Sequence, residues 1–519
     1  MANEENRPAS AEALSEQEQI RRDKLAALVS QGKDPYQVMR YDVTWHSASA
    51  IAEYERLEAQ FRAEHGDDAD AENHECAPHL EVSMAGRMMS RRIMGKASFC
   101  HIMDREGQIQ AYVRRDNVGD ECYAAFKDLD IGDIIGVKGE LFRTRTGEMS
   151  IKVMELKLLS KSLRPLPEKF HGLKDRELRY RQRYVDLIMN PEVRHTFEVR
   201  SRFIKYMRDY LDARGYIEVE TPVLNTISGG ATARPFVTHH NTLDINMYMR
   251  IATELPLKRL IVGGMERVYE IGRIFRNEGM DPRHNPEFTS IELYQAYADY
   301  TDMMDIAEGM ISGAAKSILG TYQIEWMGEK VDLTPGWPRM TMAEAVKKYV
   351  GIDFMAITDD AEAVAAAKSK GVELPPTADP TWGNALYECF DQKVEEQLVQ
   401  PTFITTYPVE VSPLAKHTPG DPRLTERFEF FICRSEIGNA FSELNDPIDQ
   451  KQRFLKQVEL RAKGDEEAGM MDDDYITALE YGLPPTGGMG IGVDRCVMML
   501  TNSDTIRDVI LFPTMKPRD

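Results

Sequence analysis

Apolar residues recur at helical spacing in two stretches near the start of the chain. In residues 16–30 they alternate with charged residues, which is typical of a helix on the protein surface. A second stretch of this kind covers residues 49–65 and gives way to a run of glycine and acidic residues. Together they predict a helical N-terminal extension over residues 1–79.

Residues 80–160 change to short apolar-rich runs separated by turn-forming residues. Three runs are followed by a helix-like segment at 121–129 and then by two more runs, which is the order of an OB-fold, a five-stranded barrel whose face binds oligonucleotides. Many small β domains share such a pattern, so the order favours this fold without establishing it. The predicted strands cover residues 80–89, 98–104, 108–114, 133–142 and 149–158.

A proline-containing linker begins at Leu163, and helical and strand-like runs then interleave as far as Phe512. The mixture predicts an α+β domain over residues 163–519, after a barrel domain over residues 80–162. Residues 342–400 are rich in helical patterns, mainly at 361–370 and 386–398, and we interpret this stretch as an insertion.

Size and charge narrow the possible functions. A chain of 519 residues exceeds what one hydrophobic core usually supports, so two or three domains are expected. The net charge of −21, taken alone, argues against a nucleic-acid partner, because phosphate contacts need Lys and Arg. Residues 80–164, however, carry 15 Lys and Arg against 12 Asp and Glu, so RNA binding stays open for this region.

Three further features concern the cellular compartment. No apolar run reaches the roughly 20 residues that a membrane-spanning helix needs. The N-terminal residues have neither the basic nor the apolar region of a secretory signal, and the six cysteines are scattered without a CxxC pair. We therefore expect a cytoplasmic protein with reduced thiols and without a membrane partner.

The densest set of charged and aromatic side chains lies between Phe275 and Tyr294. Arg276 and Glu278 are two residues apart, so on a strand they would share a face, and residues 279–282 would turn the chain into a second strand. Such a hairpin offers cations for phosphates, a ring for a base and an acceptor for its amino group, as an adenine nucleotide needs. A salt-bridged surface hairpin would explain Arg276 and Glu278, but not the full set of Arg276, Glu278, Arg283, His284 and Phe288.

Two other segments are weaker signals on their own. Residues 215–224 predict a helix end that runs into a short strand and Pro222, and packing is the default interpretation. Residues 487–492 are rich in glycine, but they lack the P-loop lysine and the spacing of a dinucleotide-binding turn. A long apolar segment follows Arg495, which puts this arginine where a glycine-rich strand meets a buried helix.

In this order along the chain, the three segments resemble motifs 1, 2 and 3 of the class II aminoacyl-tRNA synthetases. The predicted barrel is similar to the anticodon-binding domain of their aspartyl, asparaginyl and lysyl subgroup. The strings Met-Gly-Lys-Ala-Ser-Phe at 94–99 and Glu-Ile-Gly-Asn-Ala-Phe-Ser-Glu at 436–443 resemble the bacterial lysyl enzymes. The resemblance covers the chain from about Arg87 onward and implies an α+β protein, with an OB-fold barrel before a catalytic domain built on an antiparallel sheet.

The resemblance implies an ATP site on the predicted hairpin. It also implies Mg²⁺ at Glu429 and Glu436, whose carboxylates suit an ion that prefers oxygen ligands. Without the resemblance, alternation along Phe428–Ile432 would favour an exposed strand glutamate at position 429. By this resemblance, Arg276 would bind the α-phosphate, and Glu278 would accept from the adenine amino group. Arg283 and His284 would bind the β- and γ-phosphates. Phe288 would stack on one face of the base, while Arg495 would cover the other face and reach the γ-phosphate.

An acidic amino-acid pocket is implied next to the ATP site. Glu443 and Tyr294 would meet the ε-ammonium of lysine, while Glu254 and Glu292 would hold its α-ammonium or the neighbouring wall. Removal of an ammonium from water costs several kcal/mol unless a carboxylate and hydrogen bonds replace the water. Alternation turns residues 292 and 294 toward one face of their strand, and 439, 441 and 443 toward one face of theirs. The implied lysine-binding set is Gly230, Glu254, Glu292, Tyr294, Asn439, Phe441 and Glu443.

The resemblance also implies tRNA(Lys) as a partner and a homodimer formed through the segment around Pro222. Arg87, Phe99 and Gln110 match the positions that read the central uridine of the anticodon, with Phe99 stacked on the base. A place in the barrel core is the alternative for Phe99.

The implied reaction is the ATP-dependent activation of L-lysine and its transfer to the 3′ end of tRNA(Lys). It needs no nucleophilic side chain, because the amino acid's carboxylate attacks the α-phosphorus. Three alternatives remain: an aspartyl or asparaginyl enzyme, a non-catalytic synthetase-like RNA-binding regulator, and a relative that lysylates a protein.

Overall fold

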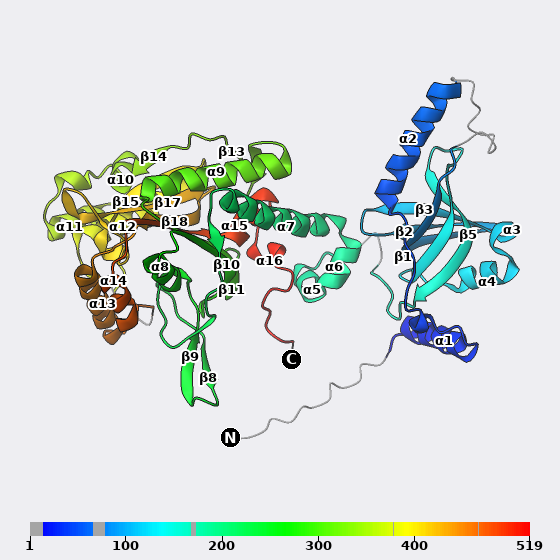
Figure 1. Cartoon of the computed structure of the whole chain (residues 1–519), viewed down its shortest axis with the longest axis horizontal. Coiled ribbons are helices and arrows are strands. Elements are labelled where there is room, and N and C mark those ends of the chain that lie inside the picture. The colour runs from blue at the N-terminus through cyan, green and yellow to red at the C-terminus, as the bar shows by residue number, and fades with distance from the viewer. Residues whose placement is uncertain (1–13, 66–77, 168–172, 377, 465–466, 519) are drawn as a thin grey trace. The chain divides into compact units, whose positions relative to one another are not determined.

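In the computed structural model the chain forms two compact units, Met1–Gly172 and Leu173–Asp519 (Figure 1). The structure describes residues 14–65, 78–167, 173–376, 378–464 and 467–518. Parts of the predicted N-terminal extension, at 1–13 and 66–77, therefore lie outside the described residues.

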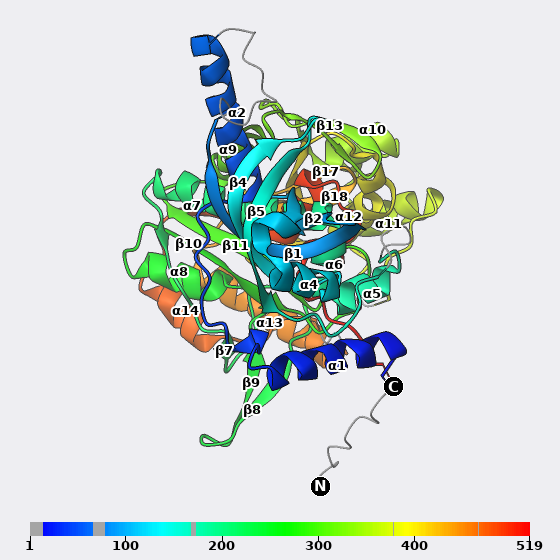
Figure 2. The same cartoon turned by 90° about the vertical axis from the view of Figure 1, so that its right-hand side faces the viewer.

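Two helices flank the barrel of the first unit. Helix α1 (Glu16–Ser30) begins at a capping box in which the hydroxyl of Ser15 accepts from the backbone N–H of Glu18. Helix α2 (Ser47–His65) begins two residues before the predicted start, where the backbone N–H of Ser47 donates to Asp104 at 2.5 Å. A short 3-10 helix, η1 (Pro35–Gln37), lies between them in the chain. The two helices lie at opposite ends of the barrel (Figures 1 and 2).

The predicted OB-fold is confirmed as a closed barrel with the strand order β1-β2-β3-β5-β4. Strand β1 is longer than predicted, because its residues beyond Met89 continue to pair with β2 up to a turn at Gly95, which has a φ of +57°. Inward-facing apolar residues of all five strands form the core with Tyr123 and Phe126 of α4. The elements are β1 (Glu81–Met94), β2 (Ala97–Met103), β3 (Gln108–Arg114), α3 (Arg115–Val118), α4 (Asp120–Asp128), β4 (Ile134–Arg143) and β5 (Met149–Ser160).

A nine-stranded sheet forms the centre of the second unit, and its main path runs β14-β15-β17-β18-β19-β11-β10-β6, with β16 paired to β17. It is antiparallel except at its two edges, where β14 pairs with β15 and β6 with β10 in parallel. The strands are β6 (Ile217–Glu218), β10 (Arg267–Phe275), β11 (Glu287–Ala296), β14 (Arg339–Thr341), β15 (Thr402–Pro408), β16 (His417–Thr418), β17 (Asp421–Ile432), β18 (Ser435–Ser442) and β19 (Thr486–Gly492).

The two faces of this sheet differ in chemistry because the side chains of a strand alternate. One face is apolar and packs against α7 (Pro191–Asp212), α9 (Tyr300–Leu319) and α15 (Val493–Leu500) in one large core cluster. Figure 1 shows α7 and α9 on one side of the sheet and α8 (Glu254–Val262) on the other. Polar residues of the central strands alternate with the core residues, so they point to the side of α8.

The predicted helical insertion is built from α10 (Met342–Tyr349), α11 (Asp360–Ser369) and α12 (Trp382–Lys393), which pack with β15 and β17 around a second core cluster. The prediction of a helix over 386–398 is wrong at both ends. Helix α12 begins after Thr381, whose hydroxyl caps the backbone N–H of Asn384, and residues beyond Lys393 form the 3-10 turn η3 (Glu395–Gln397).

The remaining elements of the second unit connect these layers. None of the helices in the described part of the chain is long and apolar enough to cross a membrane. They are α5 (Arg176–Arg181), α6 (Arg183–Met189), β7 (Leu224–Asn225), β8 (Val237–His240), β9 (Ile245–Met249), β12 (Gln323–Trp326), β13 (Glu329–Asp332), η2 (Phe354–Ala356), η4 (Val409–Val411), α13 (Pro447–Ala462), α14 (Asp473–Glu480) and α16 (Ile506–Val509).

Candidate active site

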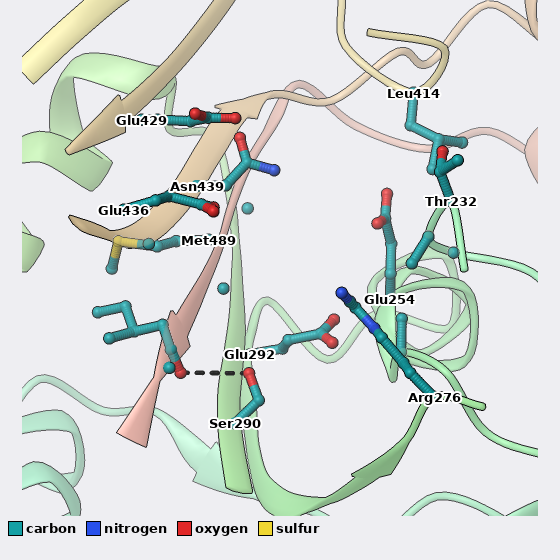
Figure 3. A pocket seen from close by; sticks show the side chains of 18 of the residues that line it. Thr232, Glu254, Arg276, Ser290, Glu292, Leu414, Glu429, Glu436, Asn439 and Met489 are labelled. Carbon is teal, nitrogen blue, oxygen red and sulfur yellow. Dashed lines mark hydrogen bonds between the residues drawn. The ribbon is translucent and has the colours of Figure 1, made fainter. Parts of the chain in front are cut away.

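A cavity of about 470 Å³ opens on the polar side of the sheet, within the usual size range of small-molecule sites. Strands β11, β17, β18 and β19, helix α8 and the loop after β10 supply its walls. Figure 3 shows Glu254, Glu292 and Arg276 gathered on one side, with Glu429, Glu436 and Asn439 on the other. The predicted site residues that line it are Gly230, Glu254, Arg276, Glu278, Arg283, His284, Phe288, Glu292, Tyr294, Glu429, Glu436, Asn439, Phe441 and Arg495.

The predicted hairpin is present, but its loop starts earlier than expected. Strands β10 and β11 pair from Arg267 opposite Gln295 to Phe275 opposite Glu287. The expectation that Arg276 and Glu278 share a strand face is therefore wrong, because both lie in the connecting loop. Only the backbone N–H of Arg276 extends the ladder, to the carbonyl of Pro286 at 2.8 Å. Both side chains still line the cavity.

Cationic side chains converge where this loop meets the end of β19. The guanidinium of Arg276 lies 5.3 Å from the ring centroid of Phe288. Arg495, in the first turn of α15, donates to the carbonyl of Glu436 at 2.6 Å, and its other nitrogen lies 3.1 Å from Nε2 of His284. Arg283 also faces this part of the cavity. Burial lowers the pKa of Arg276, which favours an anion beside it.

Two carboxylates lie opposite these cations. Glu429 is only 12% exposed, so the interpretation of an exposed strand glutamate is wrong. The polar face of β17 is turned into the cavity wall, where Glu429 accepts from Arg427 at 2.6 Å and from the hydroxyl of Tyr407 at 2.9 Å. Burial, and next the negative charge of Glu436, raise the pKa of Glu429 to about 7. A cation between the two carboxylates would relieve this repulsion.

The other end of the cavity is acidic, and its carboxylates Glu254 and Glu292 are buried. Glu292 accepts from the backbone N–H of Thr253 at 2.9 Å and from the hydroxyl of Tyr294 at 3.2 Å. Burial, and next the charge of Glu254, raise the pKa of Glu292 to about 7. Asn439 accepts from Arg427 at 2.9 Å, which fixes its amide between the two ends. This end suits a ligand that brings positive charge.

Glu443 lies deeper than the other predicted site residues. Its side chain is 0% exposed, behind the cavity wall, and forms an ion pair with Lys258 of α8. Lys258 also contacts Oε1 of Glu254 at 2.5 Å. Sequence reasoning missed Lys258, although its position four residues after Glu254 was the available signal, since such pairs face each other on a helix.

The three residues predicted to read RNA lie on the barrel of the first unit. Ser98 and Cys100 of β2 are buried, so alternation turns Phe99 outward, and the alternative of a core position for it is wrong. The ring of Phe99 lies 5.0 Å from that of Tyr112, which in turn lies 6.0 Å from that of Phe142. This half-exposed aromatic row offers flat surfaces for stacking, and sequence reasoning found only its first member.

Polar side chains surround the aromatic row. Gln110 donates to Glu148 at 2.8 Å and accepts from Ser150 at 2.8 Å. Arg87 donates to the carbonyl of Gly132 at 2.8 Å. The sheet register pairs Phe99 with Tyr112 and His101 with Gln110, so these four residues belong to the same outward face.

Each of the two structural units matches a known family model. The model described as tRNA synthetases class II (D, K and N) matches residues 175–516, and the model of an OB-fold nucleic acid binding domain matches residues 82–159. The chain belongs to the class II tRNA synthetases of the D, K and N group. The predicted resemblance and fold class are thereby confirmed.

Curated relatives match almost the whole chain. The lysine–tRNA ligase of Pelotomaculum thermopropionicum is 56% identical over 508 residues, which cover 98% of this chain and 96% of that one. The lysine–tRNA ligase of Listeria monocytogenes is 55% identical over 508 residues, 98% of this chain and 99% of that one. That of Bacillus subtilis is 54% identical over 507 residues, 98% of each.

Proposed function

We propose that the chain is a lysine–tRNA ligase, which activates L-lysine with ATP and transfers it to the 3′ end of tRNA(Lys). The observation that carries this proposal is the division of the cavity into a cationic end and an acidic end. Arg276, Arg283 and Arg495 suit a triphosphate. Glu254 and Glu292 suit the ammonium groups of lysine. An aspartate side chain would meet carboxylates at the acidic end, which disfavours an aspartyl or asparaginyl enzyme.

The chemistry then depends on position and charge. The carboxylate of lysine attacks the α-phosphorus of ATP, and pyrophosphate leaves as the adenylate forms. Arg276 binds the α-phosphate and stabilises the charge that develops there, as preorganised donors do in a site shielded from water. Phe288 stacks on the adenine, and Glu278 accepts from its amino group. The 3′-hydroxyl of the tRNA then takes the acyl group, and AMP leaves.

Glu429 and Glu436 would hold Mg²⁺, which neutralises charge on the triphosphate oxygens when it is bound. The raised pKa of Glu429 beside a second carboxylate fits a cation site. Within the described residues, no three His, Cys, Asp or Glu side chains gather closely enough to hold a metal ion by themselves. Phosphate oxygens and water would therefore complete the coordination, as is usual for this ion.

The barrel would contact the second substrate, the tRNA. Its aromatic row of Phe99, Tyr112 and Phe142 would stack on anticodon bases, with Arg87 and Gln110 beside it for polar contacts. We assign residues 80–162 to anticodon binding and residues 163–519 to catalysis, with residues 342–400 as an insertion and residues 1–79 as an extension.

The enzyme would act as a homodimer. The surface around Pro222 exposes several apolar side chains, which on a protein surface commonly mark an interface. Light scattering at micromolar concentration checks this, and a fully active monomer would contradict it. The exposed apolar residues are Ile217 at 53%, Val223 at 39%, Leu224 at 42% and Val237 at 60%.

Pyrophosphate exchange with each of the twenty amino acids tests the proposed function. We expect exchange that depends on lysine, followed by charging of tRNA(Lys) in the presence of ATP and Mg²⁺. Exchange with aspartate or asparagine, or none with any amino acid, would overturn the proposal.

A further inference from the structure

Lys258 occupies a site that resembles a binding site for an ammonium ion. Its side chain is 0% exposed, and its Nζ contacts the carboxylates of both Glu254 and Glu443. The rings of Phe441, Tyr294 and Tyr475 lie 5.3, 6.0 and 6.0 Å from Nζ. Burial by itself would lower the pKa of Lys258, but the charges of the two glutamates outweigh that effect and raise it. The ammonium therefore stays charged inside the protein.

The two oxygens of Glu443 have different surroundings. Oε2 is the atom that contacts Lys258. Both oxygens are buried, and among the described residues neither has a hydrogen bond of regular geometry, while Oε1 lies against Gly488 of β19. A buried carboxylate oxygen without a donor is costly, because it has lost its water without replacement. Because Lys258 approaches Oε2, Oε1 is the carboxylate oxygen that is left to accept from a ligand.

Gly488 lies between this oxygen and the cavity. The glycine lines the cavity on β19, and a Cβ at this position would overlap both Oε1 of Glu443 and the ring of Tyr294. Gly488 is not among the residues with positive φ, so its backbone would accept another residue. Space is therefore the reason for glycine here, because the absence of a Cβ lets Oε1 lie directly against this strand at the cavity wall.

We propose that Lys258 and Gly488 determine how the site recognises its substrate: Lys258 is a positioning residue that holds Glu443 through Oε2, and Gly488 leaves room for Oε1 at the cavity wall, where it meets the ε-ammonium of lysine. Glu443 then bridges two ammonium groups, one from the protein and one from the ligand. This inference rests on the proposed lysine–tRNA ligase function and adds two residues that set its specificity.

The charge of Lys258 also controls the ionisation of Glu443. Burial raises the pKa of Glu443 well above its ordinary value, and the charge of Lys258 opposes this shift. The groups that surround the pair of Lys258 and Glu443 are Glu254 from α8, Glu292 and Tyr294 from β11, and Tyr475 from α14. None of them is a cation, so removal of the Lys258 ammonium leaves Glu443 to take up a proton, which weakens its attraction for a ligand ammonium near neutral pH.

Lys258→Met tests the positioning role, because methionine keeps most of the side-chain volume and removes the charge. Pyrophosphate exchange with the full chain should show a KM for lysine raised at least about tenfold at pH 7, with the KM for ATP within about twofold of the parent. The KM for lysine should fall between pH 7 and pH 9 more steeply than in the parent, as Glu443 loses its proton. An unchanged KM for lysine, an equal rise for ATP, or a loss that pH does not relieve would overturn the proposal.

Lys205→Met is the matched control. Lys205 has the same spacing to its partner Asp209 on α7, but its side chain is 75% exposed. This variant should keep the parental KM values for lysine and for ATP. If Lys258→Met does not fold, as judged from its melting temperature, Gly488→Ala decides the question.

Gly488→Ala tests the opening toward Oε1. Its added methyl group should raise the KM for lysine at least about tenfold, because Glu443 is held by Lys258 and cannot move aside. Equilibrium binding of ATP should be retained. Normal activation of lysine by this variant, or an equal loss of ATP binding, would overturn the inference. A parent chain that does not activate lysine would instead overturn the proposed function.

Discussion

The barrel face and the cavity both depend on strand alternation, yet they use it for opposite kinds of recognition. On β2, alternation turns Phe99 outward into a half-exposed aromatic row. On β11, alternation turns Glu292 toward α8, where the protein covers it and it is only 9% exposed. The same local pattern thus gives a surface for stacking in one unit and a shielded charge in the other.

This difference in burial sets the energy of each contact. A stacked base on an open surface contributes about 1–3 kcal/mol and tolerates many bases. A buried carboxylate that loses its partner costs about 3–5 kcal/mol, so it selects strongly for charge. The cavity is suited to discriminate a small amino acid, while the barrel face is suited to add modest affinity for a long polymer.

The largest effect is expected from Arg276→Ala. Loss of this half-buried guanidinium should lower lysine-dependent pyrophosphate exchange by about 100- to 1000-fold or more, because it stabilises charge only where the reaction occurs. The fold should persist by circular dichroism. Arg273→Ala is the control, since Arg273 is exposed on β10, three residues before Arg276, and should be dispensable. Exchange near the parental rate in Arg276→Ala would remove the ATP-site assignment.

Glu443→Gln should weaken the binding of lysine by about 2–5 kcal/mol, which is the range for removing one partner of a buried ion pair. It keeps the shape of the side chain and leaves Lys258 with one carboxylate. Titration calorimetry measures the affinities for lysine and for ATP separately, and ATP binding should be largely retained. Glu325→Gln, at an exposed position of β12, controls for the loss of charge. If Glu443→Gln activates lysine as well as the parent, the cavity is not an ammonium site.

Phe99→Ala should raise the KM for tRNA by an amount equivalent to about 1–3 kcal/mol, the value of one stacked base. Lysine-dependent pyrophosphate exchange needs no tRNA, so it should stay at the parental rate. Measurement of both tRNA charging and pyrophosphate exchange distinguishes an effect on the barrel from an effect on the cavity. An equal loss in both would indicate that Phe99 supports the fold rather than RNA binding.

The smallest expected effect is the pH dependence of lysine binding. The pKa of Glu292 is raised to about 7 by burial and by Glu254, so in the absence of lysine this carboxyl is increasingly protonated below pH 7. An ammonium ligand needs the charged form, so affinity should increase as pH rises from 6 to 8, by about tenfold at most. Glu292→Gln should flatten this profile. A profile of the same shape in both proteins would assign the titration to another group.

The sequence by itself determined the order of the elements and much of the chemistry. Periodicity is a local property, so the two N-terminal helices, the five barrel strands and the hairpin of β10 and β11 were predictable within a few residues. The groups proposed to bind an adenine nucleotide were readable as well, because Arg276, Arg283 and Phe288 are close together in the chain. Family membership followed from three ordered segments.

Only the tertiary structure decided which of these side chains are shielded from water, and by what. Alternation predicted that Glu429 points away from Phe428, but part of its cover is the hydroxyl of Tyr407, which comes from the neighbouring strand β15. The pair of Lys258 and Glu443 joins residues 185 positions apart in the chain. Burial and long-range ion pairing depend on which distant segments pack against a face, and local spacing carries no information about those segments.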